Sequence, residues 1–268
     1  MSTAPPPAAA TGFRRKFIAC EPLLGSFIKT PTSHAIEILG GLGFDFVVID
    51  EEHAPFDRGT IDMALLAARA SGTAGIVRVA EPTQAKLLAV LDDGAMGVLV
   101  PHVASVAKAK DMVAACRYRG GRRGFSNSPR AGNYGGVGAW PHVDAQDAAI
   151  AVIAMIEDPE ALDEIDRIVA VEGLDGVFIG RGDLTIALGA PASDSAPVRA
   201  ATEKIAKAAR AAGKPVCIMV GSVAETEAYR AMGASAFIVS SDQGFMRQAA
   251  GKVAADFAAL RPSHKAAQ

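Results

Sequence analysis

Two short apolar runs in this chain each lead into a carboxylate. Residues 152–156 precede Glu157, and residues 177–180 are followed closely by Asp183. Both runs are β-branched and too short for a typical helix, as is usual for buried parallel strands. The two acids are 26 positions apart, from 157 to 183, which leaves room for one strand-helix-strand unit between neighbouring strands. Two adjacent carboxylates favour a hard divalent cation.

Two further apolar runs also end in groups that titrate or carry charge. One ends in Asp50-Glu51-Glu52-His53 and the next in Arg78. The arginine suits either an ion pair at the rim or the binding of a carboxylate or enolate oxygen. His53 is either a hydrogen-bonded surface side chain or a general acid/base near neutral pH. Any one of these groups has a structural explanation, but four strand ends carrying them together favour a site.

Short apolar runs alternate along the chain with longer, alanine-rich amphipathic segments, which predicts repeated βα units. The predicted strands are residues 23–28, 44–50, 75–79, 97–101, 151–156, 176–180, 215–220 and 236–240. Eight such units predict an α/β fold, a TIM (β/α)₈ barrel, in which the carboxyl ends of the strands carry the chemistry. The alternative is an open doubly wound sheet. The glycines at 40, 41 and 43 precede their strand, which is the wrong context for a dinucleotide site.

The helix boundaries and domain limits follow from local signals. Thr32 or Ser33, Ser105 and Asp242 are predicted to cap helices, and Gly72, Gly94, Gly213 and Gly233 lie where helices should end. Residues 119–141 form one long glycine- and arginine-rich connection, which predicts a functional loop. Residues 1–12 are expected to be a disordered leader, followed by one domain over residues 13–268.

Composition excludes several classes of protein. With 27 basic and 29 acidic residues the net charge is −2, so no global field recruits nucleic acid or a membrane surface. Three cysteines without metal-ligand spacing favour a reducing cytoplasm. No run is long enough to span a membrane. We therefore expect a cytoplasmic enzyme with no nucleic-acid or membrane partner, and the arginine-rich loop is weak evidence for RNA binding.

Several motifs together resemble one family. Residues 43–55 read GFDFVVIDEEHAP, residues 77–79 VRV, residues 99–101 LVP, and residues 171–180 VEGLDGVFIG, followed by Asp183-Leu184. This combination resembles the metal-dependent, class II pyruvate aldolases of the HpcH/HpaI family, over nearly the whole chain. The resemblance implies a barrel of the phosphoenolpyruvate/pyruvate-binding type, usually assembled as a homotrimer or homohexamer.

The resemblance also implies an activity and its residues. It implies reversible cleavage of 4-hydroxy-2-oxo acids to pyruvate and an aldehyde, in aromatic or sugar acid catabolism. Glu157 and Asp183 would ligate Mg²⁺ or Mn²⁺, with Co²⁺ also possible. Arg78 would hold the keto oxygen that becomes the enolate. His53 would transfer protons through a metal-bound water, and Asp92 would orient it, either within the chain or across a subunit interface.

The resemblance also implies substrate contacts, and the chain differs from the usual family pattern at some positions near them. Backbone N–H groups near Gly182 and Asp183 would receive the substrate carboxylate, and Arg123 of the long loop would orient or cover the substrate. Family members often have glutamine where this chain has Met155, and proline where it has Arg181. For Arg181 we weigh two options equally: added positive charge near an acidic substrate, or a side chain that points to solvent.

Three alternatives remain at this stage. An acyl-CoA lyase of the citrate-lyase β-subunit type or an oxaloacetate decarboxylase would use a similar metal-enolate barrel. A non-catalytic binding protein would be expected to lose the metal carboxylates or Arg78, and this chain keeps them. A Schiff-base aldolase needs a lysine inside the barrel, and none is expected at the predicted strand ends.

Overall fold

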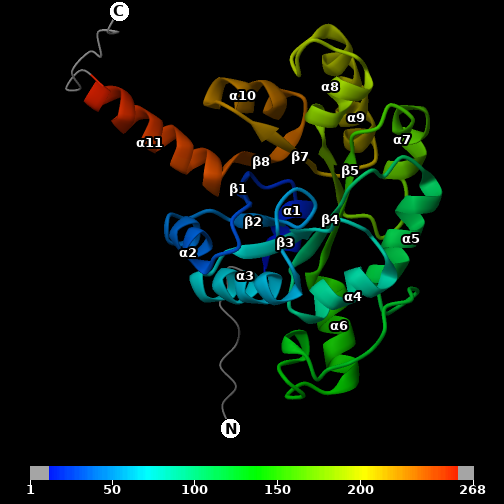
Figure 1. Ribbon diagram of the computed structural model, residues 1–268. Helices are drawn as coiled ribbons and strands as arrows, with labels where there is room; N and C mark the ends of the chain where they lie inside the picture. Colours follow the sequence, from blue (N-terminus) through cyan, green and yellow to red (C-terminus); the bar gives the residue numbers. More distant parts are fainter. Residues whose placement is uncertain (1–11, 259–268) are drawn as a thin grey trace, which may run out of the picture.

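The computed structural model of the protein describes residues 12–258, and its centre is a closed barrel of eight parallel strands in sequence order (Figure 1). The strands are β1 (Leu23–Ile28), β2 (Phe46–Asp50), β3 (Ala74–Arg78), β4 (Gly97–Val100), β5 (Ala151–Ile156), β6 (Gly176–Ile179), β7 (Val216–Val220) and β8 (Ala234–Ser241). Each agrees with the predicted run to within two residues at either end. The predicted TIM barrel is confirmed, and the open-sheet alternative is excluded.

Helices connect the strands around the outside of the barrel. They are α1 (Phe13–Ile18), α2 (Ser33–Gly41), α3 (Arg58–Ser71), α4 (Gln84–Asp92), α5 (Val106–Cys116), α6 (Ala139–Ala149), α7 (Ala161–Val169), α8 (Arg181–Ala187), α9 (Ala196–Ala211), α10 (Val223–Ala231) and α11 (Asp242–Ala258). Because all strands run in the same direction, their carboxyl ends meet at one rim. Below, this rim is called the C-terminal rim and the opposite one the N-terminal rim.

Alternate residues of each strand point into or out of the barrel, which separates two apolar layers. Phe46, Val48 and Ile76 belong to the inner cluster, whereas Val47 and Ile49 belong to the larger cluster between the sheet and the helices. The strand register places Asp50 beside Arg78, and both continue the inward-facing rows of their strands. The alternation therefore delivers these two charged side chains into the mouth of the barrel.

Helix α1 closes the N-terminal rim. Phe13 and Phe17 are almost fully buried and belong to the inner apolar cluster. A Cβ on Gly176 would lie 2.6 Å from the Phe17 ring, so glycine at the start of β6 lets this helix close the barrel. The N-terminal rim is thus sealed by aromatic side chains, which leaves the other rim open for chemistry.

Most predicted helix signals are confirmed. Thr32 and Ser105 accept hydrogen bonds from the first turns of α2 and α5. The predicted C-terminal glycines have positive φ, between 66° at Gly213 and 104° at Gly233. Asp242 differs from its prediction. Its carboxylate accepts the backbone N–H groups of Lys29 and Thr30, so it ties the start of α11 to the β1–α2 loop.

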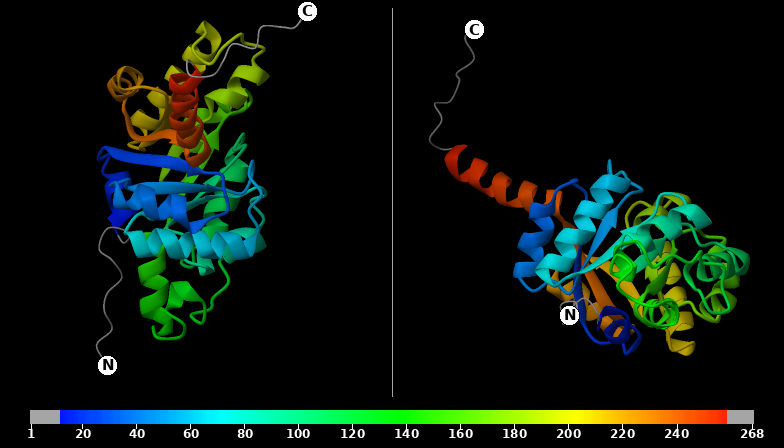
Figure 2. Two further views of the ribbon diagram at one scale, coloured as in Figure 1. Left: turned by 60° about the vertical axis from the view of Figure 1, so that its left-hand side comes forward. Right: turned by 90° about the horizontal axis from the view of Figure 1, so that it is seen from below.

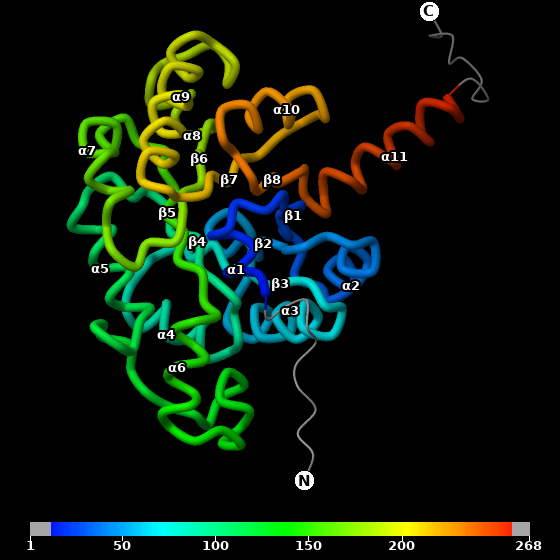
Figure 3. The backbone as a smooth tube through the Cα atoms, turned by 180° about the vertical axis from the view of Figure 1, so that it is seen from behind, coloured from blue at the N-terminus to red at the C-terminus, as the bar shows by residue number. Residues whose placement is uncertain are grey.

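Helix α11 leaves the barrel instead of packing against it (Figures 2 and 3). None of its residues is buried, and Met246, Val253 and Phe257 are 68%, 56% and 58% exposed. Their spacing of seven and four residues puts them on one face of the helix. A long helix therefore carries an apolar face that covers none of the other residues between 12 and 258.

Two predictions concern the ends of the chain and membranes. The expected leader covers residues 1–12. Residues 1–11 lie outside the described residues, and Gly12 is buried at the start of α1. Within residues 12–258, no helix combines the length and the apolar character that crossing a membrane requires.

Candidate active site

A buried ion pair between β2 and β3 forms the centre of the C-terminal rim. Arg78 donates from Nε and Nη2 to the two carboxylate oxygens of Asp50 at 2.9 and 2.8 Å. Lys29 Nζ lies 2.9 Å from the same carboxylate, which is fully buried. Burial alone would raise the pKa of Asp50, but Arg78 and Lys29 hold it below its ordinary value. The pair is therefore ionised and fixes the plane of the guanidinium.

The remaining nitrogen of Arg78 faces the rest of the site. Its Nη1 lies 3.2 Å from a carboxylate oxygen of Glu52 and 3.9 Å from the sulfur of Met155. The guanidinium also lies 4.9 Å from the centroid of the Phe27 ring. Met155 therefore adjoins the arginine inside the barrel, as a weak acceptor where the family often has an amide. The guanidinium is held on three sides and presents Nη1 to the mouth.

Glu157 is the most perturbed carboxylate of the rim. It is 1% exposed and accepts the backbone N–H of His102 at 2.8 Å. Burial raises its pKa to about 7, and the nearby charges of Asp183 and Glu52 act in the same direction. A Cβ on Gly180 would lie 2.6 Å from the Glu157 Cβ and 2.7 Å from its Oε2, so glycine after β6 is needed to admit this side chain.

Asp183 comes from the neighbouring strand, as predicted. The register of β5 and β6 pairs Ile156 with Ile179, so Glu157 and the first turn of α8 follow adjacent strand ends. Asp183 is exposed. Within residues 12–258, neither Glu157 nor Asp183 has a lysine or arginine partner within 4.0 Å. The cationic group beside Glu157 is the His102 ring, whose Nδ1 lies 3.5 Å from its carboxylate. The two carboxylates therefore have no lysine or arginine among the described residues that balances them.

His102 joins the site although the sequence did not single it out as a ligand or catalyst. Its Nδ1 lies 3.1 Å from Asp158 and its Nε2 lies 3.7 Å from Glu52. Its backbone has a φ of 54°, a rare conformation for histidine, which aims its N–H at Glu157. Burial lowers its pKa, but the hydrogen bond with Asp158 and the neighbouring carboxylates raise it overall. The sequence feature that could have identified His102 as a site residue is its position directly after β4.

His53 reaches the same rim from the β2–α3 loop. Its backbone N–H donates to Asp50 at 3.2 Å, and its Nε2 lies 3.7 Å from Glu52. The side chain is 57% exposed. The structure therefore brings His53, Arg78, Glu157 and Asp183 to one rim.

A lysine also lies in the site, contrary to the sequence-based expectation that no strand end carries one. Lys29 directly follows β1, and its ammonium group pairs with buried Asp50. The prediction failed because β1 ends at Ile28 and Lys29 was assigned to the following loop. An ammonium held by a carboxylate is a poor nucleophile.

Comparisons with known proteins agree with this geometry. Residues 23–249 match the model of the family described as HpcH/HpaI aldolase/citrate lyase. The chain belongs to this family. It is 36% identical to a 5-keto-4-deoxy-D-glucarate aldolase of Shigella dysenteriae serotype 1 (strain Sd197). The alignment spans 251 residues, which are 93% of this chain and 95% of that protein.

Two solved structures support the assignment. The HpcH/HpaI aldolase from Desulfitobacterium hafniense DCB-2 superposes with a TM-score of 0.87 at 25% identity, over 93% of this chain and 97% of that one. A family protein from Burkholderia cenocepacia J2315 gives a TM-score of 0.86 at 27% identity, over 92% and 98%. The predicted family is confirmed, and with it a lyase of the aldolase class.

Two residues that the HpcH/HpaI resemblance placed in the site lie elsewhere within the chain. Asp92 ends α4, on the side where β4 begins, and its carboxylate binds Nη2 of Arg123 at 3.1 Å. The Arg123 side chain is fully buried and lies 4.5 Å from the Tyr118 ring. The long loop thus inserts its arginine beside α4, so Asp92 and Arg123 do not join His53 in one chain. The order of the elements already places this loop, because it joins α5 to β5 and such αβ connections lie at the N-terminal rim of a barrel.

Arg181 adopts neither of the two positions considered for it. Its guanidinium donates to the hydroxyl of Tyr229 and to the carbonyl of Met219, both at 2.7 Å, and lies 2.7 Å from a carboxylate oxygen of Glu225. These partners belong to β7 and α10. Arg181 therefore ties the turn that carries Asp183 to the next βα unit.

Proposed function

We propose that this family member is a divalent-metal-dependent aldolase that reversibly cleaves 4-hydroxy-2-oxo acids to pyruvate and an aldehyde. One observation carries the proposal. Buried Arg78 is fixed by Asp50 and faces a mouth in which Glu157 and Asp183 have no lysine or arginine partner among the described residues. Cleavage of the carbon–carbon bond leaves an enolate. Arg78, together with a metal held by the two carboxylates, would supply positive charge for that enolate.

The donor set fits a metal of the Mg²⁺ or Mn²⁺ type, with Co²⁺ also acceptable. Glu157 and Asp183 are hard oxygen donors on adjacent strand ends. Residues 12–258 contain no group of three or more acidic, histidine or cysteine side chains arranged to hold a metal. Two carboxylates leave coordination positions for the keto and carboxylate oxygens of the substrate. When bound, the metal would act as a Lewis acid on the keto group.

The chain's own residues would do the rest. Arg78 Nη1 would bind the keto oxygen, with Asp50 holding the guanidinium in place. The backbone N–H groups near Gly182 and Asp183 would receive the substrate carboxylate. Gly182 leaves room for it, because nothing lies within 4 Å of the position of a Cβ there.

Proton transfer at the aldehyde oxygen would involve His53 and a water molecule. Its exposed ring lies beside Glu52 at the mouth, where a water has access. Asp92 would orient this histidine only from a neighbouring copy of the chain, and Arg123, whose side chain is fully buried, would act by holding Asp92. These two roles therefore depend on the assembly.

A homotrimer or homohexamer is the assembly that we propose. The exposed apolar face of α11, with Met246, Val253 and Phe257, supports it, because such a face is normally covered by another chain. Cys20, Cys116 and Cys217 are free thiols, which supports a reducing, cytoplasmic location. A role in sugar acid catabolism is supported by the name of the Shigella relative.

The proposal is tested by measuring pyruvate release from a panel of 4-hydroxy-2-oxo acids, before and after removal of divalent metal. We expect release that disappears with a chelator and returns with Mn²⁺ or Mg²⁺. Borohydride added with pyruvate should leave Lys29 unmodified. Metal-independent release together with a reduced pyruvate adduct on Lys29 would instead establish a Schiff-base aldolase.

The CoA-lyase and decarboxylase alternatives are not favoured by the comparisons. They are tested in the same assay with an acyl-CoA substrate and with oxaloacetate. Turnover of either compound without cleavage of any 4-hydroxy-2-oxo acid would overturn the proposal.

A further inference from the structure

The two oxygens of the Glu157 carboxylate face different neighbours in the barrel. Glu157 follows β5, which lies between β4 and β6. Its Oε1 accepts the backbone N–H of His102, which follows β4, at 2.8 Å. Its Oε2 lies on the side of β6, because a Cβ on Gly180 would come within 2.7 Å of it. Asp183 follows Gly180 in the first turn of α8, so Oε2 is the oxygen on the side of the other proposed metal ligand.

His102 holds Oε1 with its backbone and its ring. The ring Nδ1 lies 3.5 Å from the same oxygen of Glu157 and 3.1 Å from Oδ1 of Asp158. The Oδ2 atom of Asp158 is buried without a hydrogen-bond partner among the described residues, so the ring is the contact that fixes this carboxylate. The loop after β4 is thus tied to two successive residues at the end of β5.

The direction of the His102 N–H depends on an uncommon backbone conformation. Its φ is 54°, in the left-handed region that glycine and asparagine tolerate and that strains a β-branched residue. Such strain persists only where surrounding contacts enforce it, and it is concentrated at functional sites. The chain therefore spends conformational energy to aim one N–H at Oε1.

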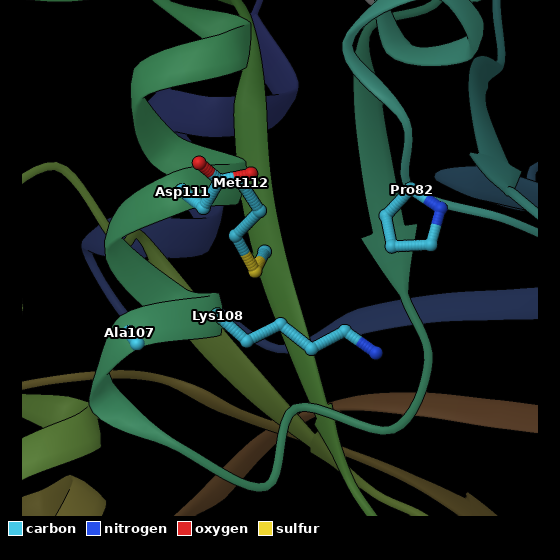
Figure 4. A pocket seen from close by; sticks show the side chains of 5 residues that line it. All are labelled: Pro82, Ala107, Lys108, Asp111 and Met112. Carbon is cyan, nitrogen blue, oxygen red and sulfur yellow. The ribbon is translucent and has the colours of Figure 1, made fainter.

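Lys108 is the nearest alternative cation, and it does not hold Glu157. Its side chain extends from the first turn of α5 across a hollow, toward the segment that carries Pro82 (Figure 4). Within residues 12–258, its ammonium group has no hydrogen-bond or ion-pair partner. In the same part of the chain, no group donates a hydrogen bond to Oε2 of Glu157. His102 therefore occupies one oxygen of Glu157 and leaves the other for a ligand.

We propose that His102 is a positioning residue that limits Glu157 to binding the metal through Oε2 alone, and that this favours Mg²⁺ and Mn²⁺ over Ca²⁺. The inference rests on the proposed function and deepens it, because it assigns a residue that selects the ion. Mg²⁺ and Mn²⁺ have compact octahedral shells, to which a carboxylate contributes one oxygen. Ca²⁺ has a larger shell and accepts both oxygens of one carboxylate. A carboxylate whose Oε1 is already held therefore suits the smaller ions.

The test is calorimetric titration with Mn²⁺ and with Ca²⁺, in the presence of pyruvate, of the wild type and His102→Val. Valine removes the ring, and its branched side chain disfavours the positive φ, so Oε1 loses both contacts. We expect Mn²⁺ affinity to fall about tenfold or more and Ca²⁺ affinity to stay within about threefold. The preference for Mn²⁺ over Ca²⁺ should therefore fall.

Two further variants separate positioning from stability. His102→Asn should keep both affinities within about threefold, because asparagine tolerates positive φ and its amide can donate to Asp158. Cys20→Val is the matched control for backbone strain. Cys20 has a φ of 55° and is exposed at the end of α1, on the opposite rim. This control should lower the Tm and change neither affinity.

Three results would overturn the inference. The first is Mn²⁺ affinity in His102→Val that equals that of the wild type. The second is an equal loss of Mn²⁺ and Ca²⁺ affinity in this variant, because Glu157 would then not be limited to one oxygen. The third is the same loss of Mn²⁺ affinity in Cys20→Val, because the effect would then come from stability.

Failure of the proposed function is distinguishable from failure of this inference. If the wild type binds neither Mn²⁺ nor Mg²⁺, the metal-dependent aldolase proposal fails. Crystal structures of the metal-free wild type and His102→Val then decide the positioning role. A Glu157 carboxylate that turns away from position 102 in the variant supports it, and an unchanged carboxylate overturns it. If both proteins bind Mn²⁺ equally, the aldolase proposal stands and the inference fails.

Discussion

Arginine–carboxylate pairs lie at both rims of this barrel, and the two rims differ in charge balance. On the N-terminal side, Asp175 accepts Arg14 at 2.7 Å, Arg117 at 2.7 Å and the N–H of Val152 at 2.8 Å. At the C-terminal rim, Arg78 satisfies Asp50, but Glu157 has no arginine or lysine partner among the described residues and a pKa raised to about 7.

This difference separates carboxylates that hold the fold together from carboxylates that bind a ligand. A carboxylate whose hydrogen bonds are met within the chain holds elements together, as Asp175 does for α1, β5 and the residues after α5. A buried carboxylate with no lysine or arginine partner, such as Glu157 beside the His102 ring, lowers stability and points to a ligand that balances its charge. We therefore interpret the N-terminal rim as the support and the C-terminal rim as the reacting centre.

The largest expected effect comes from exchanging one buried arginine at each rim, Arg78 and Arg117, in separate variants. Arg78→Lys keeps the charge but loses the planar, bidentate contact with Asp50, so kcat should fall about a hundredfold to a thousandfold. The free energy of unfolding should fall as well, because Arg78 pairs with buried Asp50. Arg117→Lys is the matched variant and should lower stability while kcat stays within about twofold. Equal loss of kcat in both variants would contradict the division between the rims.

A second variant removes the anion of the N-terminal rim. Asp175→Asn leaves the Arg14 and Arg117 guanidinium groups without their shared charge, which should lower the free energy of unfolding by about 3–5 kcal/mol. Urea unfolding measures the change, and the folded enzyme should keep its kcat/KM. Unchanged stability with reduced activity would place Asp175 in the catalytic machinery.

A smaller effect is expected at the support of Asp183. Arg181→Met removes the contacts with Tyr229, Met219 and Glu225, so the α8 turn is less firmly placed. We expect metal affinity to fall about tenfold, measured by Mn²⁺ titration. Arg199→Met, at an exposed position of α9, is the control. Equal metal affinity in both variants and the wild type would leave Arg181 without a positioning role.

The smallest effect concerns acid stability. The folded-state pKa of Asp50 lies below its ordinary value of 3.8, so its ionised form adds stability above about pH 4. That contribution is lost as the pH falls through the lower folded-state pKa. The free energy of unfolding should therefore fall less steeply below pH 4 in Asp50→Asn than in the wild type. Parallel curves would show that Asp50 is not stabilised as an ion.

The strands and much of the site could be predicted because they depend on local patterns. Short β-branched runs identify buried strands, and a charged residue directly after such a run lies at the C-terminal rim. This reasoning identifies Arg78 and Glu157 from the sequence alone. It placed Asp50 at a strand end without giving it a role, and it overlooked Lys29, because their roles depend on the register between β1, β2 and β3, which pairs distant residues.

Other features depend on tertiary packing. The positive φ of His102, which turns its N–H toward Glu157, cannot be predicted from its residue type. The long loop that carries Arg123 was expected at the mouth, yet it packs its arginine against Asp92 beside α4. The signal for this loop was present in the sequence, because it lies between a helix and the next strand, and such αβ connections lie at the N-terminal rim of a barrel.

The central claim is that the unbalanced carboxylates of the C-terminal rim bind the metal. The most direct measurement is Mn²⁺ binding, by calorimetry in the presence of pyruvate, to the wild type, Glu157→Gln and the exposed control Glu172→Gln. We expect one Mn²⁺ per chain, with affinity lowered at least about a hundredfold in Glu157→Gln and unchanged in Glu172→Gln. Equal Mn²⁺ affinity in all three proteins would contradict the claim.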